Sequence, residues 1–217
     1  MVTISGLYAI TPQTGDSAIE QDRLFASVAL ALEGGTSTLQ YRCKNAAFTF
    51  RLLQAQRLKM LCRQHGVSFI VNDDVELAAQ VHADGVHLGR EDLTISGARA
   101  RLGRSTLIGA SCYADLARAD AAVNAGADYL AFGSFFPSSV KPDAVRASLD
   151  VLRQARRRWQ LPLVAIGGIT PENAPQVIEA GADAVAVITA VFSASDPRDS
   201  ARSIARLFDH NVQRRIS

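Results

Sequence analysis

Cysteine is scarce in this chain and scattered where it occurs. The three cysteines, Cys43, Cys62 and Cys112, form no Cys-x-x-Cys pair and no Cys/His spacing. This pattern argues against a zinc site and against a disulfide scaffold, and it fits a reducing compartment.

Long apolar runs are also missing from the sequence. No stretch reaches the roughly 18 consecutive apolar residues that suggest a membrane span, and the N-terminus shows no cationic segment followed by a long apolar one. We therefore expect a cytoplasmic protein that has no membrane partner.

An excess of charge of one sign is lacking as well. The chain has 23 Lys and Arg against 21 Asp and Glu, a net charge of +2, which gives no general attraction to polyanions. The one basic run, with Arg153, Arg156, Arg157 and Arg158 at helical spacing, has no aromatic or glycine-rich element beside it. It predicts a solvated helix face, so we expect no nucleic-acid partner.

Short apolar runs alternate with longer helical segments along the chain. Eight such units within 217 residues favour an α/β fold, a closed (β/α)8 TIM barrel, with a single domain over residues 1–217. The eight runs, rich in β-branched or aromatic residues, predict strands at Leu7–Ile10, Thr38–Arg42, Ser68–Asn72, Gly85–Leu88, Leu107–Ser111, Tyr129–Phe132, Leu163–Ile166 and Ala184–Ile188.

Helices are predicted between these strands from their periodicity and from capping residues. Thr170-Pro171-Glu172 has the order of an N-cap, a first-turn proline and a first-turn acid, and Asp196-Pro197 repeats this order before the last helix. The clearest helical segments are Asp22–Glu33, Phe48–His65, Val75–Val81, Ala114–Ala125, Ser148–Trp159 and Asn173–Ala180.

A weak repeat places an aspartate where three of the helices end and a strand begins. Ala-Gly-Ala-Asp occurs twice, ending at Asp128 and Asp183, and a related segment ends at Asp84. We interpret these aspartates as structural groups that bind backbone at the amino-terminal end of the barrel.

The second predicted strand ends in an unusual set of polar side chains. Because residues two apart in a strand share a face, Gln40, Arg42 and Lys44 point to one side, away from Tyr41 and Cys43. An amide, a guanidinium and an ammonium on one face can clamp a phosphate group. The alternative is a strand end that frays into solvent.

Two further loops have the character of a phosphate site. Gly167-Gly168 follows the seventh predicted strand, and Ile188-Thr189 the eighth. In TIM barrels the loops after these strands often bind phosphate through backbone N–H groups. The other interpretation is that the two glycines only make a tight turn.

Two acids are candidates for a divalent metal. Asp73 and Asp92 follow the third and fourth predicted strands, which are neighbours in a barrel, and Mg²⁺ prefers one or two carboxylates plus phosphate oxygens and water. Asp73 with Glu76 also fits a capping box, and Asp92 fits an exposed loop acid.

The other strand ends hold no nucleophile with an adjacent base. No Ser/His/Asp set, no Cys with a helper His and no obvious Schiff-base lysine is present. A long segment from Gly133 to Pro142, with Phe135, Phe136 and Lys141, predicts either a binding loop or a surface excursion.

From its start to at least Ala190, the chain resembles the thiamine phosphate synthase family. Each of the matching motifs is weak alone, but six in register are specific. They are Gln40-x-Arg42-x-Lys44, Val71-Asn72-Asp73, Asp84-Gly85-x-His87-x-Gly89-x-x-Asp92, Gly109-x-Ser111, the loop from Gly133 to Lys141, and Ile166-Gly167-Gly168-Ile169.

The resemblance implies a transferase of thiamine biosynthesis with small-molecule substrates. Such an enzyme condenses hydroxymethylpyrimidine diphosphate with a thiazole phosphate to thiamine phosphate and releases pyrophosphate by a dissociative, Mg²⁺-assisted mechanism. It needs no protein nucleophile or general base, and Arg42, Lys44 and Lys141 would stabilise charge.

The resemblance also implies a set of binding residues. The diphosphate would meet Arg42, Lys44, Asn72, Ser111 and Lys141; Mg²⁺ would meet Asp73 and Asp92; the pyrimidine would meet Gln40; and the thiazole phosphate would meet Ser138, Gly168, Ile188 and Thr189.

Several departures from the family pattern keep alternatives open. Pro12, Arg90, Ser134 and Val140 differ from the usual residues, and Cys112-Tyr113 stand where a histidine commonly lies nearby. The alternatives are a thiazole tautomerase, a catalytically inactive ligand-binding paralogue, and another phosphate-binding barrel enzyme that would use Asp73, Asp92 or His87 as acid or base. A homo-oligomer also stays open.

Overall fold

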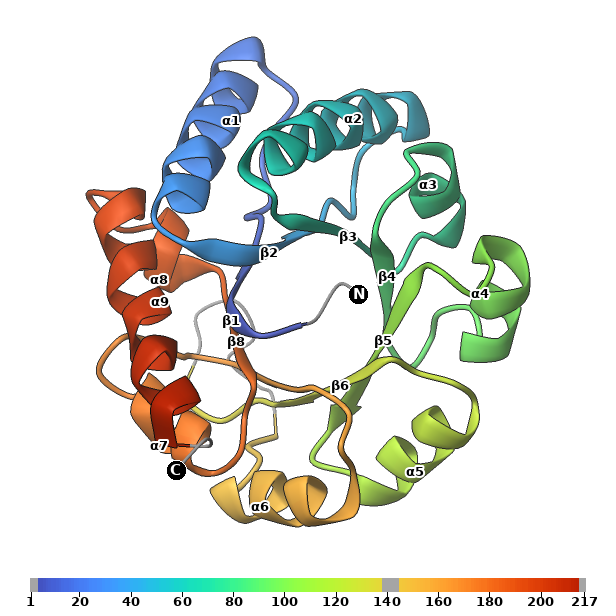
Figure 1. Ribbon diagram of the computed structural model, residues 1–217. Coiled ribbons are helices and arrows are strands. Elements are labelled where there is room, and N and C mark those ends of the chain that lie inside the picture. Colours follow the sequence, from blue (N-terminus) through green and yellow to red (C-terminus); the bar gives the residue numbers. More distant parts are fainter. Residues whose placement is uncertain (1–3, 138–144, 215–217) are drawn as a thin grey trace.

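The protein is a closed barrel of eight parallel strands, seen end-on in Figure 1. The computed structural model describes residues 4–137 and 145–214. Each strand pairs with its neighbours in sequence, and β8 pairs with β1, which confirms the predicted (β/α)8 barrel. The strands are β1 (Gly6–Ile10), β2 (Thr36–Tyr41), β3 (Ser68–Asn72), β4 (Gly85–Leu88), β5 (Leu107–Tyr113), β6 (Tyr129–Gly133), β7 (Leu163–Ile166) and β8 (Ala184–Val187).

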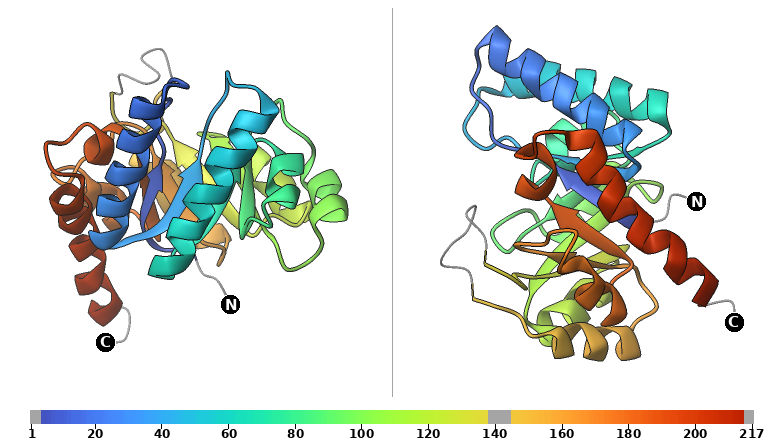
Figure 2. Two further views of the ribbon diagram at one scale, coloured as in Figure 1. Left: turned by 90° about the horizontal axis from the view of Figure 1, so that it is seen from above. Right: turned by 90° about the vertical axis from the view of Figure 1, so that its left-hand side faces the viewer.

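The helices surround the barrel, and the last of them packs against the first and against β1 (Figure 2). Two were not predicted: α4, whose interior Gly97 weakens the helical signal, and the single-turn α8. The helices are α1 (Ala18–Glu33), α2 (Phe48–His65), α3 (Val75–Gln80), α4 (Ile95–Leu102), α5 (Leu116–Asn124), α6 (Leu149–Arg158), α7 (Ala174–Glu179), α8 (Thr189–Phe192) and α9 (Pro197–Arg214).

One of the two predicted helix starts is correct. Asp196 caps α9, accepting a hydrogen bond from the Arg198 N–H at 2.8 Å. The start at Thr170 is wrong, because α7 begins at Ala174. The Asn173 side chain instead accepts a hydrogen bond from the Thr170 N–H at 2.9 Å and closes a turn ahead of the helix.

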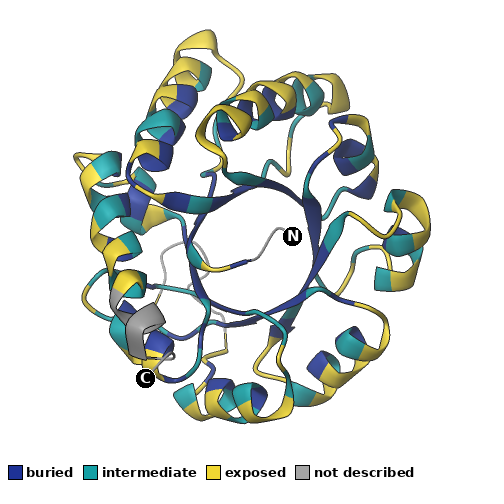
Figure 3. Ribbon diagram, in the orientation of Figure 1, coloured by how far each residue is buried: buried dark blue, intermediate teal, exposed yellow. Residues whose placement is uncertain are grey.

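Side chains alternate between the barrel interior and the helix layer. Figure 3 shows the strands almost wholly buried and the outward faces of the helices exposed. Tyr8, Tyr129 and Val164 pack with one another in one apolar cluster, whereas Leu39 and Tyr41 of β2 belong to another. Gly109 makes room for the Tyr129 ring, since a Cβ at this position would lie 2.0 Å from Tyr129 Cζ.

The three repeated aspartates bind backbone, as predicted. Each accepts a hydrogen bond from the first or second N–H of the preceding odd-numbered strand: Asp84 from Phe69 at 2.8 Å, Asp128 from Ile108 at 2.7 Å, and Asp183 from Leu163 at 2.8 Å. A carboxylate thus joins the start of an even-numbered strand to the start of its neighbour.

The basic run on α6 is only partly a solvated face. Arg153, Arg157 and Arg158 are exposed, but Arg156 pairs with Asp183 and its Nη1 donates to the Trp159 carbonyl at 3.3 Å. For Arg156 the prediction of a solvated side chain is wrong, because this arginine helps to hold the repeated aspartate. No helix within the described ranges combines the length and apolar character of a membrane span.

We predict that Asp128→Ala lowers the stability of the protein without changing its activity. The variant loses the bond from the Ile108 N–H and the ion pair with Arg99 at 2.6 Å, and an unsatisfied backbone group costs about 1–3 kcal/mol. Urea unfolding measures this cost. Asp120→Ala, which removes an exposed ion pair with Arg158 at 3.6 Å, is the control and should change stability by less than about 0.5 kcal/mol. Equal stability of both variants would contradict the structural role.

Candidate functional site

A cavity of about 800 Å³ opens at the carboxyl ends of the strands. Residues from every strand or the loop that follows it reach its wall, so the closed sheet converges them on one space. The predicted site residues that line it are Gln40, Arg42, Asn72, Ser111, Gly168, Ile188 and Thr189. Ser138 and Lys141 lie outside the described residues.

The end of β2 divides its side chains as expected. Gln40 and Arg42 face the cavity, while the Tyr41 hydroxyl points to α2 and donates to Gln54 Oε1 at 2.7 Å. The backbone N–H of Arg42 is held by the Thr11 hydroxyl of the β1 loop at 2.9 Å. Arg42 therefore leaves a fixed backbone, which excludes a frayed strand end.

Lys44 lies beyond the strand and is not part of the cavity wall. Its ammonium is half exposed and forms an ion pair with Asp73 at 3.1 Å. Burial raises the pKa of the nearby Asp92 carboxyl group, and a hydrogen bond with Asp73 raises it further. Asp92 also accepts a hydrogen bond from the Gly89 N–H at 2.6 Å. Lys44, Asp73 and Asp92 thus form one cluster, and we call Asp73 and Asp92 the acid pair.

Asp73 does not cap a helix, so that alternative is wrong. The N-cap of α3 is Asp74, whose carboxylate accepts from the Leu77 N–H at 2.9 Å and pairs with Arg51 at 2.6 Å. Asp73 has a left-handed backbone with φ 64°, a conformation that Asp and Asn tolerate best among residues with a side chain. Its carboxylate instead pairs with Lys44.

The acid pair fits a hard divalent cation. Two carboxylates in contact repel each other unless a proton or a cation lies between them. Among the described residues no group of three or more His, Cys, Asp and Glu is placed to hold a metal. A Mg²⁺ site built on two carboxylates, with the other positions filled by phosphate oxygens and water, needs no third one.

A chain of hydrogen bonds crosses the floor of the cavity. Gln40 Nε2 lies 2.8 Å from the Tyr8 hydroxyl, which lies 2.9 Å from the Tyr129 hydroxyl. The Tyr129 hydroxyl lies 3.1 Å from His87 Nδ1, and His87 Nε2 lies 2.9 Å from Ser111 Oγ. These groups come from β2, β1, β6, β4 and β5. We call them the five-residue chain.

His87 is neutral within this chain. Burial lowers the pKa of its imidazole to about 4 although the charge of Asp73 opposes this. Sequence reasoning did not select Tyr8 or Tyr129, because a tyrosine in an apolar run predicts only core packing. The one signal that could have identified them is the two-residue period of a strand, which puts each tyrosine on the face that points into the barrel.

The loops after β7 and β8 line the cavity with Gly167, Gly168 and Thr189. Gly167 and Gly168 both have positive φ, 105° and 61°, and a Cβ on Gly168 would lie 2.1 Å from the Pro137 carbonyl. The glycines therefore do make a tight turn. Within the described part of the chain the N–H groups of Gly168 and Thr189 also donate no hydrogen bond, so they are available to a ligand.

The mouth of the cavity carries two of the departures from the family pattern. The Arg90 guanidinium lies 5.1 Å from the centre of the Tyr113 ring, and Arg118 lies 5.6 Å from it. The Ser134 hydroxyl donates to the Phe136 carbonyl at 3.2 Å. Phe135 is buried in the hydrophobic core and Phe136 packs against it, so these two rings do not form an exposed lid.

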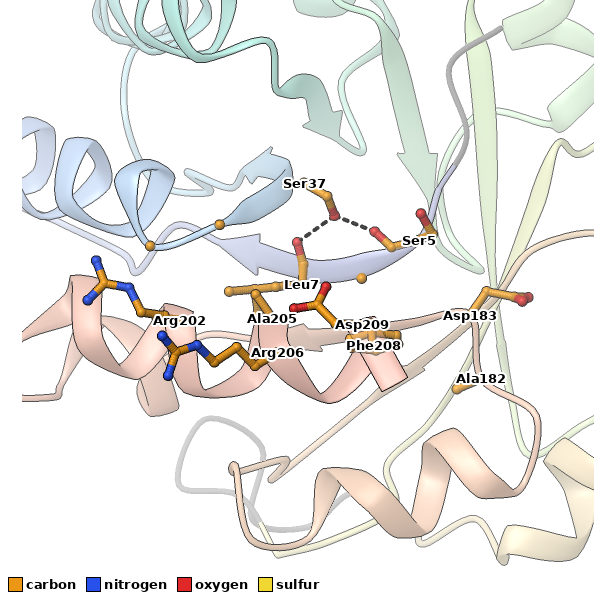
Figure 4. A pocket seen from close by; sticks show the side chains of 13 residues that line it. Ser5, Leu7, Ser37, Ala182, Asp183, Arg202, Ala205, Arg206, Phe208 and Asp209 are labelled. Atoms are coloured by element: carbon orange, nitrogen blue, oxygen red, sulfur yellow. Dashed lines mark hydrogen bonds between the residues drawn. The ribbon is translucent and has the colours of Figure 1, made fainter. Parts of the chain in front are cut away.

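A second cavity, of about 490 Å³, lies at the other end of the barrel between β1, β2 and α9 (Figure 4). The Ser37 hydroxyl lies between the carbonyl oxygens of Ser5 and Leu7, 2.9 Å from that of Leu7, and either can accept its one proton. Arg202 is paired with Asp199 at 3.1 Å. None of the predicted site residues lines this cavity.

The cysteines lie apart from the candidate site. None of the three lines the cavity at the strand ends. Cys62 and Cys112 are buried, and burial raises the pKa of both thiols to about 12. A protonated, buried thiol is a poor nucleophile.

Two known proteins similar in sequence have the same name. The chain is 52% identical over 206 residues to a "Thiamine-phosphate synthase" from Nitrosococcus oceani, an alignment that covers 95% of this chain and 94% of that protein. It is 51% identical over 203 residues to a protein of the same name from Thiobacillus denitrificans, with 94% of each chain covered.

Solved structures agree in fold and, in one case, in sequence. A thiamine phosphate pyrophosphorylase from Pyrococcus furiosus superposes with a TM-score of 0.84 at 38% identity and covers 94% of this chain and 96% of its own. An orotidine 5'-phosphate decarboxylase from Pyrococcus horikoshii, with a TM-score of 0.64, 15% identity, and 93% and 99% coverage, shares the fold alone. The family described as thiamine monophosphate synthase matches residues 7–191. With the motifs placed around one cavity and half of the sequence shared with such relatives, the chain belongs to this family.

Proposed function

We propose that the protein is a transferase that joins hydroxymethylpyrimidine diphosphate to a thiazole phosphate and releases pyrophosphate. The observation that carries this proposal is one cavity that joins Arg42 and Ser111 to the open N–H groups of Gly168 and Thr189. Two anion-binding regions on one cavity suit two phosphorylated substrates. Relatives with this name at 52% and 51% identity support it.

The reaction breaks one bond and forms another at a single carbon. The exocyclic C–O bond of the pyrimidine diphosphate breaks, and the electron pair leaves with pyrophosphate. The thiazole nitrogen then donates its lone pair to the carbocation. These two reaction steps need a stabilised leaving group and exclusion of water rather than a protein nucleophile.

The residues of the site divide between the two substrates in this proposal. Arg42, Lys44, Asn72 and Ser111 bind the diphosphate, with Lys141 beyond the described residues as a further cation. Gln40 reads the pyrimidine ring through its amide. Gly168, Ile188 and Thr189, with Ser138, bind the thiazole phosphate.

Asp73 and Asp92 would hold a Mg²⁺ ion. When bound, the ion neutralises charge on the leaving diphosphate. The protein would hold both carboxylates beside the residues that bind the diphosphate. The Gly89 N–H fixes the position of Asp92, and Lys44 balances the charge of Asp73. A cytoplasmic location and a homo-oligomer remain predictions.

An assay with both substrates and Mg²⁺ tests the proposal directly. Formation of thiamine phosphate and an equal amount of pyrophosphate is expected. Binding of either substrate without product would identify an inactive paralogue. Isomerisation of a thiazole alone would identify a tautomerase, and either result would overturn the proposal.

We predict that Arg42→Ala and Lys44→Ala each lower turnover by about 10²–10³-fold, the usual effect of losing one group that stabilises transition-state charge. Tm should change little, because Lys44 takes part only in a half-exposed ion pair. Arg101→Ala, which breaks the exposed pair with Glu76 at 3.0 Å, is the control and should keep full turnover. If both site variants unfold, Arg42 and Lys44 have a structural role, and the predicted role in charge stabilisation is wrong.

We predict that Asp73→Asn folds normally and loses activity by at least about 100-fold at limiting Mg²⁺. Asparagine tolerates the left-handed backbone but lacks the charge that the cation requires. Asp74→Asn makes the same change one residue away, and because asparagine caps as well as aspartate, this control should remain active. Calorimetric titration with Mg²⁺ and pyrophosphate compares the two variants. Normal turnover of Asp73→Asn would leave Asp92 alone as the metal ligand.

We predict that no cysteine takes part in the reaction. The triple variant Cys43→Ser, Cys62→Ser, Cys112→Ser should retain turnover, but its Tm should fall because two hydroxyls replace buried thiols. Cys43→Ser alone, at a half-buried position, should keep the Tm of the parent. Loss of turnover in a triple variant that is still folded would contradict this prediction.

A further inference from the structure

The five-residue chain has an unusual property: each group between its ends makes two hydrogen bonds within it. Gln40, Tyr8, Tyr129 and His87 are all buried, with at most 8% of each exposed. In such a setting every proton must have an acceptor. The direction of one hydrogen bond therefore fixes the direction of the next.

The direction starts at Gln40. Its Nε2 can only donate, so the Tyr8 oxygen accepts this bond at 2.8 Å. The single Tyr8 proton then points to the Tyr129 oxygen at 2.9 Å. The Tyr129 proton has one remaining partner, His87 Nδ1 at 3.1 Å.

The imidazole carries this direction to the other side of the barrel, since a ring nitrogen that accepts a hydrogen bond has no proton of its own. If Nδ1 accepts from Tyr129, the ring proton is on Nε2, which donates to Ser111 Oγ at 2.9 Å. The Ser111 proton is then left without a partner in the chain. Ser111 lines the cavity, so this proton is directed to whatever binds there.

We propose that the five-residue chain is a one-way series of hydrogen bonds that begins at Gln40 and presets the Ser111 hydroxyl as a donor to an anionic oxygen in the cavity. Tyr8, Tyr129 and His87 are positioning residues in this role. They act through Gln40 and Ser111.

The opposite direction has a different chemical consequence. If Gln40 presented its oxygen to Tyr8, each proton would reverse, His87 would carry its proton on Nδ1, and Ser111 would donate to Nε2. Ser111 would then offer only lone pairs to the cavity, which repel a phosphate oxygen. A site with Arg42 on the same wall favours an anion and hence the first direction.

The inference deepens the proposed function and rests on it only in the identity of the anion, a diphosphate. It makes Gln40 more than a contact to the pyrimidine. The same amide that reads the ring also sets the polarity of the group that receives the diphosphate, across four intervening hydrogen bonds.

Nitrogen NMR of the free protein tests the direction without any substrate. Protonated and unprotonated ring nitrogens of a neutral histidine resonate in separate regions. The His87 signals are assigned by their loss in His87→Gln. The Nε2–H tautomer at neutral pH is expected, and the Nδ1–H tautomer would overturn the inference.

One variant reverses the start of the chain. Gln40→Glu replaces the donor amide by a carboxylate, which when ionised can only accept from the Tyr8 hydroxyl. Each later hydrogen bond then reverses, so this variant should show the Nδ1–H tautomer and should weaken binding of pyrophosphate with Mg²⁺ by roughly tenfold, as for the loss of one hydrogen bond. Retention of the parent tautomer and affinity in the folded variant would overturn the inference.

Tyr41→Phe is the matched control. Tyr41 is also buried, and its hydroxyl bonds Gln54 on the helix side of the barrel. It should change neither the tautomer nor the pyrophosphate affinity. A protein that binds pyrophosphate and shows the Nε2–H tautomer but forms no thiamine phosphate would support this inference and overturn only the proposed function.

Discussion

On each strand of the barrel, adjacent side chains point to opposite sides, and closure of the sheet makes one of those sides an enclosed interior. This alternation puts Gln40 and Arg42 on the inside and Tyr41 against α2. Parallel direction adds the second constraint, because all eight strands end at the same rim. Residues that are far apart in sequence, such as Tyr8 and Tyr129, thereby meet within 2.9 Å.

The two ends of the barrel use charge differently. At the amino-terminal end, Asp84, Asp128 and Asp183 accept hydrogen bonds from backbone N–H groups. Asp128 and Asp183 also form ion pairs with arginines. At the carboxyl end, Arg42 has no carboxylate within ion-pair distance among the described residues. Lys44 pairs with Asp73 at this end, but the Arg42 guanidinium is a charge there that a ligand can neutralise, whereas the paired charges at the amino-terminal end stabilise the fold. Between them, the five-residue chain crosses the floor of the cavity.

The strands and the face of each strand could be predicted from local pattern. Ser68–Asn72, Gly85–Leu88 and Leu163–Ile166 have the predicted bounds, since β-branched runs between turn residues carry that signal. The helix start at Thr170 was wrong because Asn173, three residues later, offers a competing side-chain acceptor. The alternative that Asp73 caps α3 fails for a similar reason: Asp73 and Asp74 are both acids, and only the backbone decides which one faces the helix.

The sequence by itself determined the barrel, the rim at which the polar residues gather, and the likeness to one family, because these depend on periodicity and on motifs within single segments. Tertiary structure alone decided that Lys44 pairs with Asp73 and that Arg156 pairs with Asp183 at the amino-terminal end of the barrel. It alone also decided that Tyr8, Tyr129 and His87 form one hydrogen-bonded series. Such contacts join different strands, and their distances follow from how the sheet closes. No single segment carries that information.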